Sequence, residues 1–343
     1  MSIQKKLFDR LADGTAVDAY TLKNKNGVLL TVLTWGGIMQ QLWLPDRNGE
    51  LQDVICGFDT VEDYKNGGGY QGALIGRYGN RIEGGRFILN QKEYVLNCNE
   101  GGRCHLHGGN AGYDSRLWEA EAVEGEAEDR LTLSLISPDG EEGYPGTLRV
   151  RVTYTLTAEN TLHIDYEAVS DQDTVCNLTS HTYYNLSGYD GACVMDHLLW
   201  VNSEYYDSVD ELLIPDADAP APVAGTRFDF RSRKPIETPL DHNFHLRGLP
   251  RECKKAVIYC DPVSGRTLTV TTDLPAVQIY TGCVMDGEVC FKGRIPQRKL
   301  HAIAMETQFA PNTPNRPDMP SCVLKAGERY TSRTSFAFGL TED

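Results

Sequence analysis

The sequence lacks the features of a membrane protein and of a nucleic-acid-binding protein. It contains no apolar run of about 18 residues, the minimum that a transmembrane helix needs. Lys and Arg number 33 against 48 Asp and Glu, so the formal net charge is −15, whereas a face that binds nucleic acid needs an excess of positive charge. We therefore expect neither a membrane nor a nucleic acid as a partner, and a neutral or cationic small ligand instead.

Signals for export, disulfides and zinc are equally scarce. Residues 1–10 contain no apolar segment of the kind found in secretory signals, so we expect a cytoplasmic protein. The ten cysteines are scattered and include no Cys-x-x-Cys pair. In a cytoplasmic protein this pattern predicts reduced, mostly buried thiols rather than disulfides or zinc ligands.

Long helical patterns and internal repeats are also scarce. Residues 59–64 fit one or two helical turns, while most of the chain consists of short segments in which apolar and polar residues alternate. The clearest of these segments are 130–136, 148–156, 161–169, 267–272 and 331–338. Turns rich in the 33 Gly and 16 Pro separate them, so the sequence predicts an all-β fold, either a large antiparallel sandwich or a barrel.

Nothing in the sequence divides the chain into separate domains. The acid-rich segment 119–129 lies between two predicted strands, and we expect it to be a solvated hairpin. Residues 216–225, which are rich in Ala, Pro and Asp, form a loop too short to separate two domains. We therefore expect one domain over residues 1–343.

Two neighbouring segments are unusually rich in Gly and Arg. Residues 67–72 match the spacing G-x-G-x-x-G, but no β-α-β pattern surrounds the match, so we do not expect a dinucleotide site. Further on, Arg81 follows Asn80 between apolar residues, and a functional and a structural role are equally compatible with that setting. We expect Arg77 to be structural.

Two histidines stand in unusual contexts. His105 and His107 share one face if they lie on a strand, so they could chelate a metal, but no third ligand is evident nearby. Two glycines directly after His107 allow a ligand to approach closely and favour a site there, whereas His105 is expected to be structural. His181 lies between Ser180 and Thr182. Adjacent strand residues point to opposite faces and no G-x-S-x-G motif occurs, which disfavours a serine hydrolase.

Glu306 is the most informative carboxylate. It follows an apolar run, residues 301–305, that is typical of a buried strand. A carboxylate in such a place is costly unless it is paired or functional, and burial raises its pKa into the range of a general base. A buried ion pair is the alternative. Asp241 and Gln278 add further polar groups in apolar settings.

Six segments carry these groups in an order that resembles the aldose 1-epimerase (galactose mutarotase) family. They are residues 75–77 with 80–82, then 106–109, 180–188, 241–244, 278–282 and 306–308. The resemblance extends from about residue 37 to residue 338. Each motif alone carries little weight, but six in the same order indicate membership of the family.

The resemblance implies a single antiparallel β-sandwich with an open sugar cleft, and interconversion of the α and β anomers of hexoses such as galactose and glucose. It implies Glu306 as general base, His181 as general acid and His107 as an assisting group at the ring oxygen. It also implies that four residues hold the sugar hydroxyls, namely Asn80, Arg81, Asp241 and Gln278. We expect a neutral monosaccharide as substrate and a monomer or homodimer.

The chemistry of anomer exchange needs only such groups. The C1 hydroxyl must lose a proton and the ring oxygen must gain one, so one base and one acid suffice, and ring closure reverses their roles. A buried Glu and a His can both exchange protons near neutral pH. We therefore expect no cofactor and no metal.

Three other functions remain open at this point. A hexose-6-phosphate mutarotase would need an arginine cluster for the phosphate, and the candidate arginines are Arg77, Arg86, Arg103 and Arg116. A glycoside hydrolase would use Asp241 and Glu306 as its two carboxyl groups. A non-catalytic sugar-binding module would depend on stacking aromatic side chains rather than on a Glu and His pair.

Overall fold

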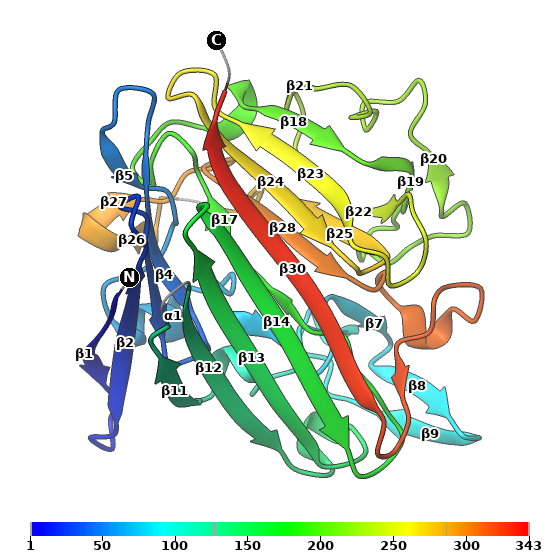
Figure 1. Ribbon diagram of the computed structural model, residues 1–343. Coiled ribbons are helices and arrows are strands. Elements are labelled where there is room, and N and C mark those ends of the chain that lie inside the picture. The colour runs from blue at the N-terminus through cyan, green and yellow to red at the C-terminus, as the bar shows by residue number, and fades with distance from the viewer. Residues whose placement is uncertain (1, 126–127, 286, 342–343) are drawn as a thin grey trace.

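Antiparallel sheets stacked against one another make up the chain in this computed structural model, which describes residues 2–125, 128–285 and 287–341 (Figure 1). Every pairing between its named strands is antiparallel, and neither of the two largest sheets closes on itself. The sequence left a sandwich and a barrel open, and the structure is a sandwich.

The largest sheet has nine strands and forms the front layer in Figure 1. In spatial order its strands are β11 (Glu119–Val123), β12 (Glu128–Ser137), β13 (Leu148–Thr157), β14 (Thr161–Ser170), β30 (Arg329–Leu340), β24 (Arg266–Thr272), β23 (Lys254–Cys260), β18 (Leu198–Val201) and β21 (Lys234–Pro235). The five strands expected from alternation are all present, as β12, β13, β14, β24 and β30. The last of them, β30, lies in the middle of this sheet rather than at its edge.

Behind it lies a six-stranded sheet that carries much of the candidate site. Its order is β17 (Tyr183–Tyr184), β28 (Ile303–Gln308), β25 (Ala276–Tyr280), β22 (Asp241–Leu246), β19 (Ser203–Tyr206) and β20 (Ala221–Pro222). A third sheet, at the N-terminus, has the order β1 (Ser2–Arg10), β2 (Ala16–Lys23), β3 (Leu29–Leu33), β4 (Met39–Pro45) and β5 (Leu51–Asp53).

Short strand pairs and turns connect these layers. The pairs are β6 (Leu74–Ile75) with β16 (Thr179–Ser180), β7 (Arg81–Glu83) with β10 (Cys104–Leu106), β8 (Arg86–Leu89) with β9 (Lys92–Val95), β15 (Thr174–Val175) with β29 (Val323–Leu324), and β26 (Cys290–Phe291) with β27 (Ile295–Pro296). Five 3₁₀ turns occur in the described residues, at Tyr113–Ser115, Glu141–Gly143, Val194–Asp196, Lys292–Arg294 and Thr313–Asn315.

The helical turns expected at residues 59–64 appear slightly later, as α1 (Val61–Asn66), which is the only α-helix in the part of the chain that the structure describes. Thr60 caps it, because its side chain accepts a hydrogen bond from the Asp63 amide. No helix among the described residues has the length and hydropathy needed to cross a membrane.

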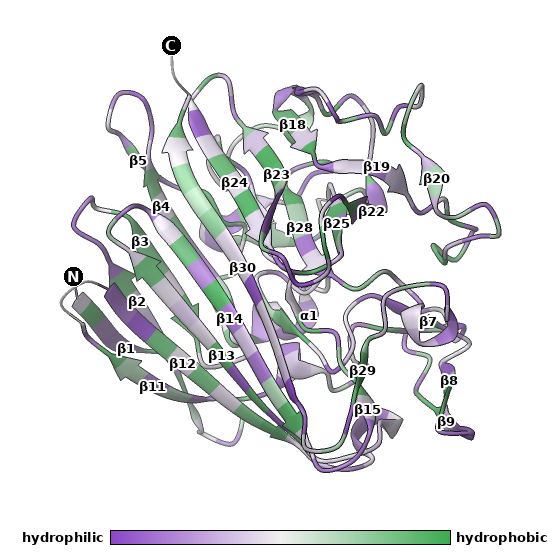
Figure 2. Cartoon of the chain, turned by 45° about the vertical axis from the view of Figure 1, so that its right-hand side comes forward, coloured by the Kyte–Doolittle hydropathy of each residue, from purple (hydrophilic) through white to green (hydrophobic). Residues whose placement is uncertain are grey.

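The alternation of residue types explains why the main sheet packs as it does. Along β13, Val150, Val152 and Tyr154 are buried, whereas Arg149 and Arg151 between them are exposed. Figure 2 shows the same banding of hydrophobic and hydrophilic residues along β12, β14 and β30. Strand residues two apart share a face, so one face of each strand enters a continuous apolar core, and that core also includes side chains from β22, β25 and β28.

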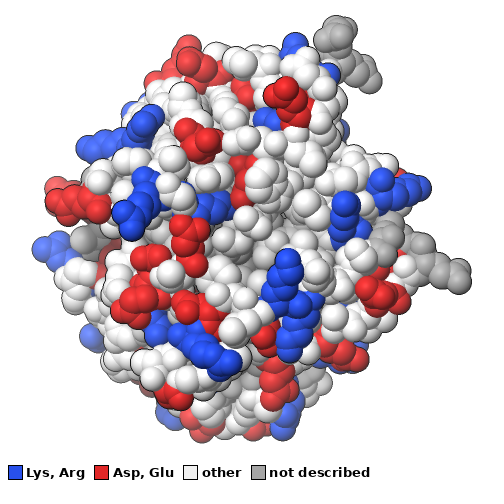
Figure 3. Space-filling view, turned by 90° about the vertical axis from the view of Figure 1, so that its left-hand side faces the viewer, with Lys and Arg blue, Asp and Glu red and all other residues white. Residues whose placement is uncertain are grey.

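The acid-rich segment and the thiols behave mostly as expected. Residues 119–123 form the exposed edge strand β11, which pairs with β12, so the segment is half of a strand pair rather than only a turn; residues 126–127 lie outside the described part. All ten cysteines are free thiols, and half of them are buried. On the face that Figure 3 draws, acidic and basic side chains are intermixed rather than separated into areas of one sign.

A buried ion pair connects the N-terminal sheet to the segment after β26. Lys292 Nζ lies 2.5 Å from Asp53 Oδ2 and 2.8 Å from the Gln40 carbonyl oxygen, and both charged side chains are at most 5% exposed. We expect Lys292→Met to lower the free energy of unfolding by about 3–5 kcal/mol, because it leaves the Asp53 charge buried and unpaired. Chemical denaturation measures this loss. The double variant that adds Asp53→Asn should recover part of it, and equal losses in the single and double variants would contradict the assignment.

Candidate active site

Three titratable side chains from distant parts of the sequence meet at one end of the six-stranded sheet. His181 Nε2 lies 3.5 Å from Glu306 Oε1. The rings of His107 and His181 are 5.2 Å apart and nearly perpendicular, at 84°. The three groups therefore form one cluster, and each of them is at most 6% exposed.

The strand register places Glu306 where the sequence suggested. It lies within β28, whose six residues are all buried, opposite Gln278 on β25. Because Met305 on the other face of β28 belongs to the apolar core, Glu306 points away from that core. His181 follows β16, and its backbone N–H donates to the Ala73 carbonyl oxygen. Buried strands thus hold the carboxylate and the imidazole on two sides of the site.

A left-handed backbone turns His107 into the site. Strand β10 ends at Leu106, and His107 has φ 52°, which non-glycine residues rarely adopt. Asn80, with φ 66°, donates its backbone N–H to His107 Nδ1 at 3.1 Å, and the His107 N–H donates to the Asn80 carbonyl oxygen. Because Nδ1 accepts this hydrogen bond, the neutral His107 ring carries its proton on Nε2.

The remaining predicted residues lie around this cluster in two bonded pairs. Arg81 donates from Nε and Nη2 to the two Glu100 carboxylate oxygens, both at 2.7 Å. Gln278 Nε2 donates to Asp241 Oδ1 at 2.6 Å, and Gln278 Oε1 is buried without a partner. A sugar hydroxyl can supply that missing hydrogen bond, because an unpaired buried polar atom is costly.

Burial shifts the pKa of Glu306 and the pKa values of the two histidines in opposite directions. It raises the pKa of Glu306 well above its ordinary value, and the nearby Asp241 carboxylate raises it further. Burial lowers the pKa of His181 to about 4 and that of His107 well below its ordinary value. In the ligand-free protein burial therefore favours the neutral form of both side chains, which is protonated Glu306 and unprotonated His181.

The same three residues offer atoms of the types that bind metals, all within 4.8 Å of one another. The hydrogen bond from Asn80 argues against a three-ligand metal centre. One ring nitrogen of His107 is occupied by that N–H and the other carries the proton, so neither presents a free lone pair. The cluster is better suited to proton transfer.

His105 does not join His107 in the site. Its Nδ1 contacts the Asn97 carbonyl oxygen at 2.8 Å and its Nε2 contacts the Tyr144 hydroxyl at 2.6 Å, so both ring nitrogens are occupied elsewhere. Arg77 is also structural: it is buried and donates to the Ser137 hydroxyl and the Pro145 carbonyl oxygen.

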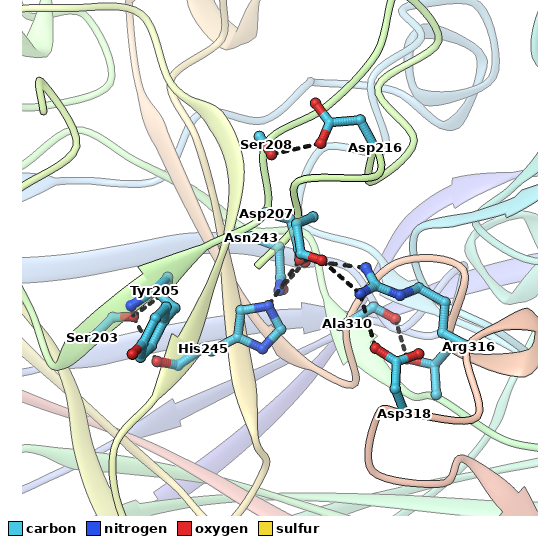
Figure 4. Close-up of polar contacts among 12 residues, drawn as sticks. Ser203, Tyr205, Asp207, Ser208, Asp216, Asn243, His245, Ala310, Arg316 and Asp318 are labelled. Atoms are coloured by element: carbon cyan, nitrogen blue, oxygen red, sulfur yellow. Dashed lines mark hydrogen bonds and ion pairs between the residues drawn. The ribbon is translucent and has the colours of Figure 1, made fainter. Parts of the chain in front are cut away.

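A second polar network lies further along the same sheet (Figure 4). Asp207 is fully buried and accepts hydrogen bonds from Asn243 Nδ2 at 2.8 Å and from His245 Nε2 at 2.9 Å, while Arg316 Nη1 lies 3.7 Å away. Asn243 also accepts a hydrogen bond from Gln308. Since Asn243 pairs with Gln278 and Gln308 lies two residues after Glu306, the network braces the strands that carry the site.

Several residues of the site were not found from the sequence. Glu100 lies in a Gly-rich turn, where a carboxylate is ordinary, and nothing local indicates its partner Arg81. Tyr70 falls within the glycine-rich segment 67–72, and its ring lies 4.7 Å from the His107 ring. The Asp207 network joins residues about 36 to 109 positions apart in sequence, so no short motif could reveal it.

Comparisons with known proteins agree with this arrangement. The family model for aldose 1-epimerase matches residues 18–337. The galactose mutarotase of Sus scrofa is 37% identical over 355 residues, covering 99% of each chain. The aldose 1-epimerase of Haemophilus influenzae is 36% identical over 340 residues, covering 95% of this chain and 97% of that protein.

Solved structures share the fold over nearly the whole chain. A galactose 1-epimerase from Lactobacillus acidophilus superposes with a TM-score of 0.85 at 29% identity, covering 100% of both chains. An aldose epimerase homologue from C. elegans superposes with a TM-score of 0.86 at 28% identity, covering 94% of this chain and 98% of that one. The family model and these relatives together show that this chain belongs to the aldose 1-epimerase family.

Proposed function

We propose that this protein is an aldose 1-epimerase that interconverts the α and β anomers of hexoses such as galactose and glucose. The observation that carries the proposal is the 3.5 Å approach of His181 Nε2 to Glu306 Oε1 within one buried cluster. Acid–base catalysis of a hemiacetal needs one proton acceptor and one proton donor within reach of the same ring.

Each residue has a defined role in this reaction. Glu306 takes the proton of the C1 hydroxyl while His181 gives a proton to the ring oxygen, and the ring opens to the aldehyde. The C1–C2 bond then rotates. The two residues reverse their roles, the ring closes on the other carbonyl face, and the opposite anomer leaves.

The opposite pKa shifts of Glu306 and His181 are consistent with this cycle. After ring opening Glu306 carries the proton and His181 is neutral, which is the distribution that burial favours in the ligand-free protein. Binding of a cyclic sugar must therefore shift the proton towards His181, and hydrogen bonds from sugar hydroxyls to the Glu306 carboxylate favour that shift. We propose that His107, whose proton is on Nε2, donates a hydrogen bond to the ring oxygen.

The polar residues around the pair hold the sugar. Asn80, Arg81, Asp241 and Gln278 together offer hydrogen-bond donors and acceptors, as neighbouring sugar hydroxyls require. We also propose that residues 1–343 form one domain, and the largest apolar cluster supports this, because it includes side chains from all three large sheets. We propose that the protein acts in the cytoplasm as a monomer or homodimer.

The charges favour a neutral sugar over a sugar phosphate. Glu100 neutralises Arg81, and two further carboxylates, Asp241 and Glu306, lie close by. The arginines considered for phosphate binding are engaged elsewhere or exposed: Arg77 bonds to Ser137, Arg116 pairs with Glu141, Arg86 lies 3.7 Å from Glu93, and Arg103 is exposed. A phosphate group would therefore find Arg81 already paired with Glu100 and would also meet the nearby Asp241 carboxyl group.

Neither of the other two functions explains both histidines. A glycoside hydrolase pairs two carboxyl groups across the scissile bond, whereas here Glu306 lies 3.5 Å from an imidazole. A non-catalytic sugar-binding module has no need for a buried group whose pKa is strongly shifted.

Polarimetry tests the proposal directly. Freshly dissolved α-galactose should reach its equilibrium rotation faster with the protein than without it, and α-glucose should respond in the same way. We expect little acceleration for α-glucose 6-phosphate. A larger effect on the phosphate than on the free sugar would assign the protein to the phosphate-specific alternative, and release of sugar from an aryl glycoside would assign it to the hydrolases.

Glu100 should act on sugar binding through Arg81. We expect Glu100→Gln to raise KM by about 3- to 10-fold with little change in kcat, because the paired guanidinium loses one charged partner that is 35% exposed. Steady-state polarimetry separates the two constants. Glu93→Gln, which removes an exposed carboxylate near Arg86, is the matched control. A fall in kcat with an unchanged KM would show that Glu100 acts on the chemical step instead.

A further inference from the structure

The glycine-rich segment 67–72 has no role in the mechanism above, although it lies directly against it. It connects α1 to β6, and its end is fixed to the segment that carries His181. The Gly72 N–H donates to the His181 carbonyl oxygen at 3.0 Å, and the His181 N–H donates to the Ala73 carbonyl oxygen at 2.9 Å. Gly72, two residues after Tyr70, is therefore held against the His181 backbone.

Tyr70, within this segment, contacts the rings of both His107 and His181. Its ring centroid lies 4.7 Å from that of His107, at an interplanar angle of 65°, and 5.9 Å from that of His181. The two histidine rings contact each other at 5.2 Å. Three rings thus pack together, and the orientation of each depends on the other two.

The backbone around Tyr70 is unusual for an aromatic residue. Tyr70 has φ 58°, in the left-handed region, and Gly68, Gly69 and Gly72 have positive φ as well. A side chain at Gly72 would place its Cβ 2.4 Å from the Met39 carbonyl oxygen, so this position excludes other residues. A non-glycine residue in this region costs free energy, and such strain is concentrated at functional sites.

Tyr70 also lines a cavity. It has a volume of about 360 Å³ and is lined in part by Trp35, Lys65, Asn110 and Asp114. Lys65 and Asn110 are exposed, so water reaches this cavity. Tyr70 lines this cavity whereas His107 and His181 are not among its lining residues, so Tyr70 contacts both the cavity and the two buried histidines.

We propose that Tyr70 is a positioning residue of the proton-transfer site, which fixes the orientation of the His107 and His181 rings and separates them from the water in the adjacent cavity. The proposal rests on the function proposed above. The groups that contact the two histidines or act on them electrostatically are Glu306, Arg81, His105, Tyr70, Tyr183 and Tyr280. Unlike the charged members of this set, Tyr70 acts on the two histidines through the packing of its ring and not through a charge.

Tyr70→Ala should join the cavity to the catalytic cluster. We expect kcat to fall by about 10- to 100-fold, since small misplacements of catalytic groups have effects of that size, with a smaller change in KM. Water entering the site should raise the pKa of His181 from about 4 towards the ordinary value of about 6.5. The acid limb of the kcat/KM profile should move to higher pH accordingly. Tyr70→Phe, which keeps the ring, should restore most of kcat and the low acid limb.

Two further measurements separate the possible outcomes. NMR titration of the histidine ring nitrogens follows their pKa in each variant without any assay of activity, so it tests the role of Tyr70 even if the wild-type protein does not accelerate mutarotation. Tyr94→Ala removes a half-buried tyrosine that stacks on Phe87 at 5.4 Å, and it should leave kcat and both pKa values unchanged. Tyr70→Leu, which fills the same space, substitutes for the alanine variant if that protein unfolds.

The proposal is overturned if the variants without the ring keep wild-type kcat and histidine pKa values. A rise in KM alone would make Tyr70 a sugar contact and not a positioning residue. Equal losses in the Phe and Ala variants would assign the effect to the hydroxyl instead of the ring.

Discussion

Glu306→Gln should lower kcat for mutarotation by about 10²- to 10⁴-fold while leaving the fold intact. That range is the contribution of one general acid or base to a rate. Glutamine has nearly the same shape and can still form hydrogen bonds, but it cannot accept the C1 hydroxyl proton. Since Glu306 lies in the middle of a fully buried strand, a substitution of equal size is needed to separate lost chemistry from lost packing.

Stability provides an internal check on this variant. Because burial raises the pKa of Glu306, the folded protein favours the protonated carboxyl, and folding stability is lost as the pH rises from the ordinary pKa towards the raised one. The side chain of the glutamine variant does not ionise. The melting temperature of this variant, relative to that of the wild type, should therefore increase as the pH rises. Glu159→Gln, at an exposed turn, is the control for both measurements. A glutamine variant that turns over at the wild-type rate would remove Glu306 from the mechanism.

His181→Asn should have an effect of similar size. The asparagine amide can donate a hydrogen bond to the ring oxygen but cannot give up a proton to it, so kcat should again fall by about 10²- to 10⁴-fold. In the wild type, kcat/KM should fall on the acid side only near pH 4. There His181 becomes protonated while Glu306 is protonated as well, so no group is left to accept the C1 hydroxyl proton. This acid limb should disappear from the residual activity of the variant.

A matched histidine makes this test specific. His163 on β14 is half-buried and bonds to the Ser335 hydroxyl at 2.7 Å, in the nine-stranded sheet rather than in the sheet that carries Glu306. We expect His163→Asn to keep both the rate and the acid limb. If His181→Asn kept the wild-type rate, or if its acid limb stayed near pH 4, another group would be the proton donor.

The sequence predicted the strands better than the contacts between them. Alternation identified β12, β13 and β14 almost to the residue, because one face of each strand packs on the core and the other meets solvent. The same signal is absent from β28, whose residues are all buried. There the apolar run before Glu306 indicated the strand, and the carboxylate within it indicated the site.

The site itself was predictable to the extent that it consists of motifs. His107 and His181 stand in short, distinctive segments, and the structure brings both to Glu306. The residues that support them do not stand in such segments. Glu100, Tyr70 and Asp207 act through contacts made by folding, and a tyrosine or carboxylate in a turn has no local pattern that distinguishes a support from a solvated side chain.

The position of β30 between β14 and β24 has a consequence for how the protein is made. Ala337 on β30 pairs with Thr161 on β14 and with Thr269 on β24, so the two halves of the main sheet are joined only by a strand that is synthesised after all the other strands that the structure describes. Until then β14 presents an open edge, and exposed strand edges are prone to pair with other chains. The main sheet can therefore be completed only once β30 has been synthesised.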